Sequence, residues 1–265
     1  MTKKKKVTII IVCVLLAIAV TFTLVATLHD DVNLALWKNV PTHLPEGFTI
    51  TAHAGCEGTK PDTLEPLQKG WELGMPIVEF DVNFTPSGEP VLFHDTPQEG
   101  GSYLPFEAAL AFLADKAPLQ GNIDMKRTMH MDKVYEAIKK YDLQDRVFFT
   151  GIGEKDAPTV QRDCPGIRYY LNVNVECGTE RQIKELIETT KKLGAIGVNL
   201  KFTKLSQELC DMCHANGLLV SVFTPDKMVV ISHVLRFSPD NITTRRPTLV
   251  QKAIETRPKK GAEKK

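Results

Sequence analysis

Residues 77–82 read IVEFDV, a run in which apolar residues alternate with two carboxylates. Short apolar runs with alternating polarity are typical of β-strands that are at least half buried. Because successive side chains of a strand point to opposite faces, Glu79 and Asp81 share one face, while Val78 and Phe80 share the other. The run therefore predicts a strand that presents two acids side by side.

Similar short runs occur on both sides of this strand and alternate with longer amphipathic runs. The short runs predict strands at residues 48–53, 77–82, 91–94, 119–125, 146–150, 168–172, 196–200 and 218–223. The amphipathic runs predict helices at residues 63–73, 105–113, 131–141, 180–193 and 206–215. About eight strand–helix units in roughly 210 residues favour a closed (β/α)8 TIM barrel, with a doubly wound open sheet as the alternative.

One connection in this series departs from the regular pattern. The second and third predicted strands are joined through residues 85–88, Thr-Pro-Ser-Gly. This connection is too short to contain a helix. The second helix of the barrel is therefore expected to be missing.

The N-terminal segment has the composition of a membrane anchor. Lysines at positions 3–6 precede an apolar run, Val7 to Leu28, which as a helix would span roughly 30 Å of hydrocarbon. A cleaved signal peptide is the alternative, although its apolar region would usually be only about 7–15 residues long. Because positively charged flanks stay in the cytoplasm, a single-pass anchor would place the rest of the chain outside.

The remaining boundaries follow from composition. Residues 1–29 are predicted to form the cytoplasmic lysines and the transmembrane anchor, 30–46 a linker, 47–255 the barrel and 256–265 a basic tail. The formal net charge of +1 gives no indication of a nucleic-acid partner. No obligate protein partner is evident from the sequence. Outside the anchor there are five cysteines, which cannot all pair within one chain, so a dense disulfide framework is not expected, and a single bridge is possible outside the cytoplasm.

Polar and charged residues gather at the ends of the first four predicted strands. They are His53, Glu79, Asp81, His94, Asp124 and Lys126. In a parallel barrel the carboxyl ends of the strands form one rim, where active sites are found. Asp124 and Lys126 share a strand face, as Glu79 and Asp81 do, so these strands would present their polar groups to one pocket.

Each of these groups has a chemical use. Three carboxylates close together repel one another unless a cation holds them, and an all-oxygen ligand set suits Mg²⁺ or Ca²⁺ rather than zinc. Two histidines that titrate near neutrality can take a proton from a nucleophile and return one to a leaving group. Lys126 would be a point charge for a phosphate oxygen. A single acid at a strand end is more often a cap or a surface group, but the combination favours a functional site.

The order and spacing of these residues resemble the glycerophosphodiester phosphodiesterase family, within the phosphatidylinositol-specific phospholipase C-like barrels. The matching segments are His53-Ala54-Gly55, Asp62-Thr63-Leu64, Glu79-Phe80-Asp81, Ser87 to Val91, His94-Asp95, Asp124-Met125-Lys126, His214-x-x-Gly217 and Ile242-Thr243-Thr244. The similarity covers about residues 49–247. The chain departs from the common pattern at Ala54, where arginine is usual, at Asp124, where glutamate is usual, and at Phe223, which replaces a tryptophan.

The resemblance implies a TIM-barrel enzyme that hydrolyses glycerophosphodiesters to glycerol 3-phosphate and an alcohol with a bound divalent cation. By position it implies an acid–base pair of His53 and His94, metal ligands Glu79, Asp81 and Asp124, and a phosphate ligand Lys126. In the mechanism of the family, a glycerol hydroxyl attacks phosphorus and displaces the alcohol, and water then opens the resulting cyclic phosphate. The metal neutralises the developing charge.

Two alternative functions use the same barrel. The first is a lipid-acting enzyme, such as a lysophospholipase D or another phosphodiesterase that forms cyclic phosphates, whose substrate the anchor would keep nearby. The second is a non-catalytic, membrane-tethered binding module, which the absence of the usual arginine at Ala54 favours. The retention of both histidines and all three acids favours an enzyme.

Overall fold

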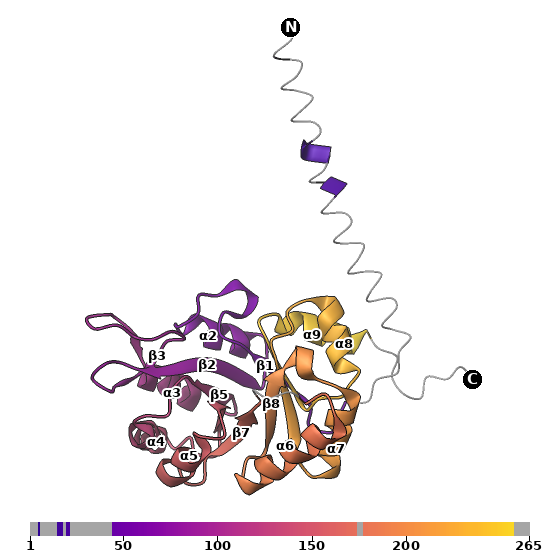
Figure 1. Ribbon diagram of the computed structural model, residues 1–265. Helices are drawn as coiled ribbons and strands as arrows, with labels where there is room; N and C mark the ends of the chain where they lie inside the picture. The colour runs from indigo at the N-terminus through magenta and orange to yellow at the C-terminus, as the bar shows by residue number, and fades with distance from the viewer. Residues whose placement is uncertain (1–4, 6–14, 18–19, 22–43, 174–176, 257–265) are drawn as a thin grey trace.

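The computed structural model describes residue 5 and residues 15–17, 20–21, 44–173 and 177–256 (Figure 1). The strands are β1 (Thr49–Ala52), β2 (Ile77–Phe84), β3 (Pro90–Leu92), β4 (Leu104–Pro105), β5 (Gln120–Met125), β6 (Val147–Ile152), β7 (Arg168–Asn172), β8 (Gly197–Lys201), β9 (Leu219–Phe223) and β10 (Asn241–Thr244). The α-helices are α2 (Glu65–Glu72), α3 (Phe106–Asp115), α4 (Met131–Lys140), α5 (Ala157–Asp163), α6 (Glu180–Lys192), α7 (Gln207–Ala215), α8 (Met228–Leu235) and α9 (Pro247–Glu255). Two 3-10 turns are η1 (Cys56–Gly58) and η2 (Phe202–Lys204).

Eight of these strands run parallel and close into a barrel. Their order is β1, β2, β5, β6, β7, β8, β9 and β10, and β10 pairs with β1 to close the ring. The helices α2 to α9 alternate with these strands along the chain and form the outer layer (Figure 1). The predicted (β/α)8 barrel is therefore confirmed, and the doubly wound open sheet is excluded.

One predicted barrel strand has a different role in the structure. The sequence predicts a parallel strand at residues 91–94, but β3 pairs antiparallel with β2 and continues antiparallel into β4. The reason is the short connection through residues 85–88, since a turn of this length can join only antiparallel strands. The eighth barrel strand is instead β10, which the sequence analysis does not predict as a strand.

The helix that was expected to be missing is present. After the β3–β4 hairpin the chain forms α3 and only then enters β5, the next barrel strand. The connection between two parallel neighbours, β2 and β5, therefore contains both the hairpin and a helix. The expectation was wrong because it treated β3 as a member of the barrel.

The alternation within residues 77–82 determines which side chains face the helices. Val78 and Phe80 belong to the large apolar core that includes residues of the barrel and of the helices, and both are buried. Burial of a large apolar side chain stabilises a fold by about 1.5–3 kcal/mol. Gly70 allows α2 to approach closely, because an added Cβ would lie 2.6 Å from Cγ1 of Val78. The intervening acids, Glu79 and Asp81, are left on the inner face of the barrel.

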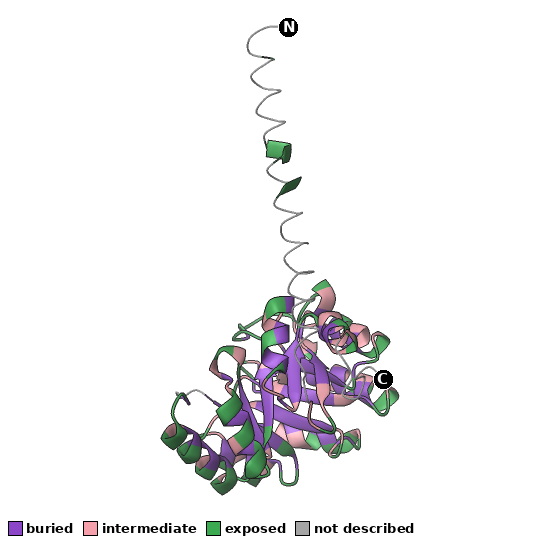
Figure 2. Ribbon diagram, turned by 90° about the vertical axis from the view of Figure 1, so that its right-hand side faces the viewer, coloured by how far each residue is buried: buried purple, intermediate pink, exposed green. Residues whose placement is uncertain are grey.

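The barrel interior has an apolar layer below a polar layer. Ile77, Phe148 and Tyr170 form a buried cluster that is separate from the main core, and the rings of Phe148 and Tyr170 meet edge to face with centroids 5.6 Å apart. Two residues further along each of these strands the inward side chain is polar. Figure 2 shows that the strands are mostly buried and that exposed residues lie on the outer helices. A ligand would therefore reach the polar layer from the carboxyl ends of the strands.

Most of the predicted anchor lies outside the described residues. Of residues 1–29 the structure describes only residues 5, 15–17 and 20–21, and the predicted tail is described only at residue 256. In the described part of the chain no helix has the length and hydrophobicity needed to cross a membrane. The anchor and the outward location of the barrel stay predictions.

The cysteines of the described part of the chain lie in the core. Cys56, Cys164, Cys177, Cys210 and Cys213 are all buried. Burial raises the pKa of Cys56 to about 11 and that of Cys164 to about 12, so these side chains stay protonated at neutral pH. They serve as small apolar residues of the core.

Candidate active site

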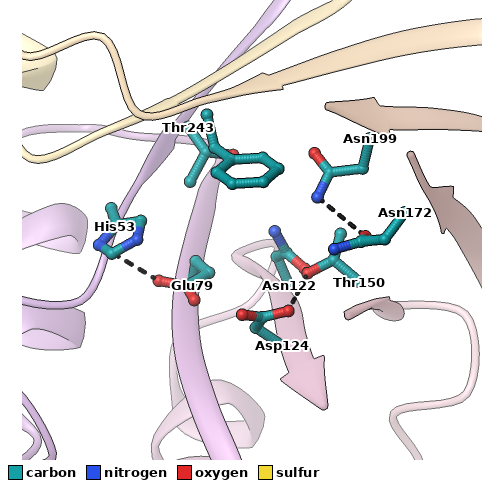
Figure 3. Close-up of a pocket in the computed structure, with 9 residues that line it drawn as sticks. His53, Glu79, Asn122, Asp124, Thr150, Asn172, Asn199 and Thr243 are labelled. Atoms are coloured by element: carbon teal, nitrogen blue, oxygen red, sulfur yellow. Dashed lines mark hydrogen bonds and ion pairs between the residues drawn. The ribbon is translucent and has the colours of Figure 1, made fainter. Parts of the chain in front are cut away.

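A cavity of about 100 Å³ lies at the carboxyl ends of the barrel strands. Its lining consists of His53, Glu79, Asn122, Asp124, Thr150, Asn172, Asn199, Phe223 and Thr243 (Figure 3). Every barrel strand contributes at least one of these residues, and β5 contributes two; the contribution of β1 is the residue that follows it. Active sites of (β/α)8 barrels are found at this end.

Three carboxylates converge at this end of the barrel. One carboxylate oxygen from each of Glu79, Asp81 and Asp124 lies within 4.8 Å of the others. They meet because β2 and β5 are adjacent and in register, with Asp81 beside Asp124 and Glu79 beside Asn122. Glu79 and Asp81 are only 2% and 4% exposed. The structure thus brings together all three acids that the sequence predicts as metal ligands.

Lys126 contacts two of these acids. Its Nζ lies 2.6 Å from Oδ1 of Asp81 and 2.5 Å from Oδ2 of Asp124. Burial acts to lower the pKa of Lys126, but the two carboxylates outweigh it and raise the pKa above its ordinary value. The lysine is therefore a cation at neutral pH. When all three acids are ionised, two negative charges remain unbalanced in this cluster.

Glu79 lies in an environment that disfavours its ionised form. Burial, and then the charges of Asp81 and Asp124, raise its pKa well above the ordinary value. The backbone N–H of Ala54 donates a hydrogen bond of 2.7 Å to Oε2 and partly opposes this rise. A divalent cation fits these residues, since it would supply the missing positive charge and prefers oxygen ligands. Glu79, Asp81 and Asp124 are the residues that could hold it.

His53 lies at the edge of the same cavity, directly after β1. Its Nδ1 is 2.8 Å from the carbonyl oxygen of Ala54 and 3.8 Å from Oε2 of Glu79. Because a carbonyl oxygen can only accept, Nδ1 carries the proton and Nε2 retains its lone pair. Burial lowers the pKa of His53, so the ring is neutral near pH 7. A neutral imidazole with a free Nε2 can act as a general base.

His94 lies in a different environment. Its side chain is 62% exposed, its Nδ1 lies 2.8 Å from Oδ1 of Asp95, and its backbone N–H donates to Oδ1 of Asp62 at 3.0 Å. The preceding N–H, of Phe93, donates to the carbonyl oxygen of Asp81 at 3.2 Å. The structure therefore places His94 next to the second half of β2, but not in the lining of the cavity.

No family model matches the chain. A curated protein named glycerophosphodiester phosphodiesterase, from Caldanaerobacter subterraneus subsp. tengcongensis, is 21% identical over 234 residues, which cover 75% of this chain and 94% of that protein. This chain is similar to glycerophosphodiester phosphodiesterases. The resemblance inferred from the sequence motifs is thereby confirmed.

Solved structures of glycerophosphodiester phosphodiesterases share the fold. A phosphodiesterase from Oleispira antarctica, in complex with the product sn-glycerol-3-phosphate, is 20% identical, with a TM-score of 0.66 and coverage of 80% of this chain and 97% of that chain. The glycerophosphodiester phosphodiesterase from Agrobacterium tumefaciens is 16% identical, with a TM-score of 0.63 and coverage of 77% and 98%. At these identities the likeness establishes the (β/α)8 fold.

The sequence analysis did not select the neutral polar residues of the cavity in this glycerophosphodiester phosphodiesterase-like barrel. These residues are Asn122, Thr150, Asn172, Asn199 and Thr243. Each lies in or next to the carboxyl-terminal half of its strand, on the inner face. Asn172 and Asn199 each lie at or near the end of a predicted strand, as the acids do, so their positions alone would have selected them. They were overlooked because an amide carries no charge and is common in loops.

Proposed function

We propose that this chain is a metal-dependent phosphoric diester hydrolase that converts glycerophosphodiesters to glycerol 3-phosphate and an alcohol. The observation that carries the proposal is the location of Glu79, Asp124 and the neutral His53 around one cavity, with Asp81 in the same acidic cluster. The names of the relatives support it, since the curated relative is a glycerophosphodiester phosphodiesterase. The phosphodiesterase from Oleispira antarctica is described in complex with sn-glycerol-3-phosphate as its product.

The acidic cluster, through a bound metal ion, and Lys126 would each contribute to phosphate binding. Glu79, Asp81 and Asp124 would hold Mg²⁺ or Ca²⁺, which when bound supplies positive charge to the phosphoryl oxygens and lowers the pKa of an attacking hydroxyl. Lys126, which already lies beside two of these acids, would hold a phosphate oxygen as a point charge.

His53 and His94 would transfer the protons of the reaction as general base and general acid. Nε2 of His53 would accept the proton of a glycerol hydroxyl as its oxygen bonds to phosphorus, and the bond from Nδ1 to the carbonyl of Ala54 keeps the ring oriented for this. The exposed His94 would donate a proton to the departing alcohol as its bond to phosphorus breaks. Water would then open the cyclic phosphate to give glycerol 3-phosphate.

The test is the release of glycerol 3-phosphate from glycerophosphocholine by the purified full-length chain, with Mg²⁺, Ca²⁺ or EDTA. We expect turnover with at least one of the two ions and none with EDTA. Glu79→Gln should abolish turnover, whereas Glu136→Gln, which changes an exposed glutamate on α4, should leave it unchanged. A folded chain that turns over neither substrate would favour the non-catalytic binding module. Turnover of lysophosphatidylcholine without turnover of glycerophosphocholine would favour the lipid-acting enzyme.

We further propose that residues 1–29 anchor the chain in a membrane as a single-pass protein with the barrel on the extracytoplasmic side. The apolar run from Val7 to Leu28 and the preceding lysines support this proposal. Alkaline extraction of membranes should leave the full-length chain in the membrane pellet, and protease added to the outer side should digest the barrel. Release by alkali would contradict the anchor.

A further inference from the structure

On the basis of the proposed function, we propose that Arg245 is a further substrate-binding residue, whose guanidinium holds a phosphate oxygen of the diester beside His53. Arg245 directly follows β10, and His53 directly follows β1. These two strands pair in parallel and close the barrel, so the two residues lie at the same end of neighbouring strands. This is the end at which the cavity lies.

The pairing of β1 with β10 places Arg245 on the inner face of the barrel. Thr51 is the register partner of Thr243, whose side chain lines the cavity. The ladder continues beyond the strand ends, since the N–H of His53 donates to the carbonyl oxygen of Thr244 at 3.0 Å. Because side chains alternate along a strand, Arg245 continues the face of Thr243, as His53 continues the face of Thr51. The arginine therefore lies beside His53 at the mouth of the cavity.

The electrostatics of His53 support this position. Of the charged groups that shift the pKa of His53, Arg245 has the largest effect, and it lowers this pKa, whereas Asp81 and Asp124 raise it. Since Coulomb energies fall with distance, the guanidinium lies near the imidazole. The side chain of Arg245 is 50% exposed, so a ligand that enters the cavity can reach it.

The loops around Arg245 hold it in place but leave most of its donors free. The backbone N–H of Arg245 donates to Oδ1 of Asp226 at 2.8 Å, and its carbonyl oxygen accepts from the N–H of Glu57 at 2.8 Å. Its Nη1 donates to Oδ2 of Asp226 at 3.1 Å. A guanidinium has five N–H donors, and the side chain of Arg245 has no second acceptor in the described part of the chain. The remaining donors suit the paired oxygens of a phosphate.

The charge balance of the acidic cluster explains why a second cation would be needed. The three acids carry three negative charges, which Lys126 and a divalent cation together would cancel. The phosphodiester brings a negative charge of its own and gains a second as the attacking oxygen bonds to phosphorus. The lining of the cavity contains no lysine or arginine. Arg245 supplies the positive charge for the phosphate from the mouth of the cavity.

The test measures the binding of glycerol 3-phosphate to the full-length chain by isothermal titration calorimetry, with Mg²⁺ or Ca²⁺ present. We expect Arg245→Gln to bind it about 10–100-fold more weakly, the effect of a hydrogen bond to a charged group. Its affinity for the metal ion alone should be unchanged. The matched control is Arg162→Gln, which removes an exposed arginine that also pairs with an aspartate, Asp163, and it should bind as the unmodified chain does. Unchanged affinity for glycerol 3-phosphate in Arg245→Gln would overturn the assignment.

Arg245→Lys separates a phosphate-binding role from a structural one. Lysine keeps the charge but not the planar fork, so this variant should bind glycerol 3-phosphate with an affinity between those of the unmodified chain and Arg245→Gln. The melting temperatures of both variants should match that of the unmodified chain, because an exposed ion pair contributes little to stability. Equally weak binding by both variants, together with equally lowered melting temperatures, would assign Arg245 to the structure of the loop and overturn the proposal.

The outcomes for Arg245 and for the hydrolase are separable. Weaker binding of glycerol 3-phosphate by Arg245→Gln, without turnover of glycerophosphocholine by the unmodified chain, would support the phosphate ligand and contradict the hydrolase. Turnover by the unmodified chain, with the same kcat/KM and the same affinity for glycerol 3-phosphate in Arg245→Gln, would overturn the phosphate ligand and leave the hydrolase intact. An unmodified chain that does not bind glycerol 3-phosphate would overturn the role of Arg245.

Discussion

The two sides of the cavity differ in charge. The charged side has His53, Glu79 and Asp124 in the cavity lining, and Asp81 and Lys126 belong to the same acidic cluster next to it. The amide side, on β6, β7 and β8, consists of Thr150, Asn172 and Asn199. The charges of Asp81 and Asp124 raise the pKa values of Glu79 and Lys126, whereas on the amide side the N–H of Gly151 orients Asn172 by a hydrogen bond. Mutations on the charged side should therefore act mainly on catalysis and metal binding, and mutations on the amide side mainly on the stability of the cavity wall.

The largest effect is expected on the charged side. Asp124→Asn removes one charge from the acidic cluster and should lower kcat/KM for glycerophosphocholine by about 10³-fold, because charge stabilisation is the main contribution at such sites. It should also weaken the binding of Mg²⁺ or Ca²⁺, measured by calorimetry. Glu136→Gln serves as the matched control. An Asp124→Asn variant with unchanged metal affinity would remove Asp124 from the metal site.

The two histidines should differ in their effects. His53→Ala removes the buried ring beside Glu79 and should lower kcat by about 10²–10³-fold. His94→Ala changes an exposed side chain and should lower kcat by a smaller factor. Steady-state kinetics of both variants would rank them. An equal loss in both variants would mean that the charged side extends to His94 when substrate is bound.

On the amide side, the two asparagines should differ in their effect on stability. Asn172→Leu removes the acceptor of the Gly151 N–H and should lower the free energy of unfolding by about 1–3 kcal/mol. Asn199→Leu removes an oxygen that has no partner and should cause little or no loss. Urea denaturation of the two variants measures the difference. If Asn199→Leu were the more destabilising change, the hydrogen bond from Gly151 would not be the main contribution to the stability of the amide side.

The smallest effect expected is a change in the pH dependence of stability. Glu79 has a higher pKa in the folded chain than its ordinary value of 4.5, so folding takes up a proton there. Its contribution is fully present below that ordinary pKa and is lost as the pH rises through the folded pKa. Without metal, the free energy of unfolding should fall with rising pH relative to Glu79→Gln, and added Mg²⁺ or Ca²⁺ should remove the gap. If the difference in free energy of unfolding between the unmodified chain and Glu79→Gln stayed the same at all pH values, the carboxylates of Glu79, Asp81 and Asp124 would not interact.

The fold class was predictable because its signal is local. Alternating side chains within 77–82 and repeated strand–helix units depend only on neighbours in the chain, and both are confirmed. Which strands belong to the barrel could not be predicted from neighbouring residues. β10 has the mostly polar sequence Asn-Ile-Thr-Thr. It forms a strand because it pairs with β1, which is far away in the sequence, with Asn241 beside Thr49. β3 has a more typical strand sequence and yet lies outside the barrel.

The sequence by itself determined the barrel class, the shared face of Glu79 and Asp81, and the choice of acids that converge at the rim. Only the tertiary structure decided that His53 is buried in the cavity lining and His94 exposed outside it. It alone also decided which amide groups stay unpaired. The physical reason is that side-chain types are written in the sequence, whereas burial and hydrogen-bond partners depend on segments that meet only when the barrel closes.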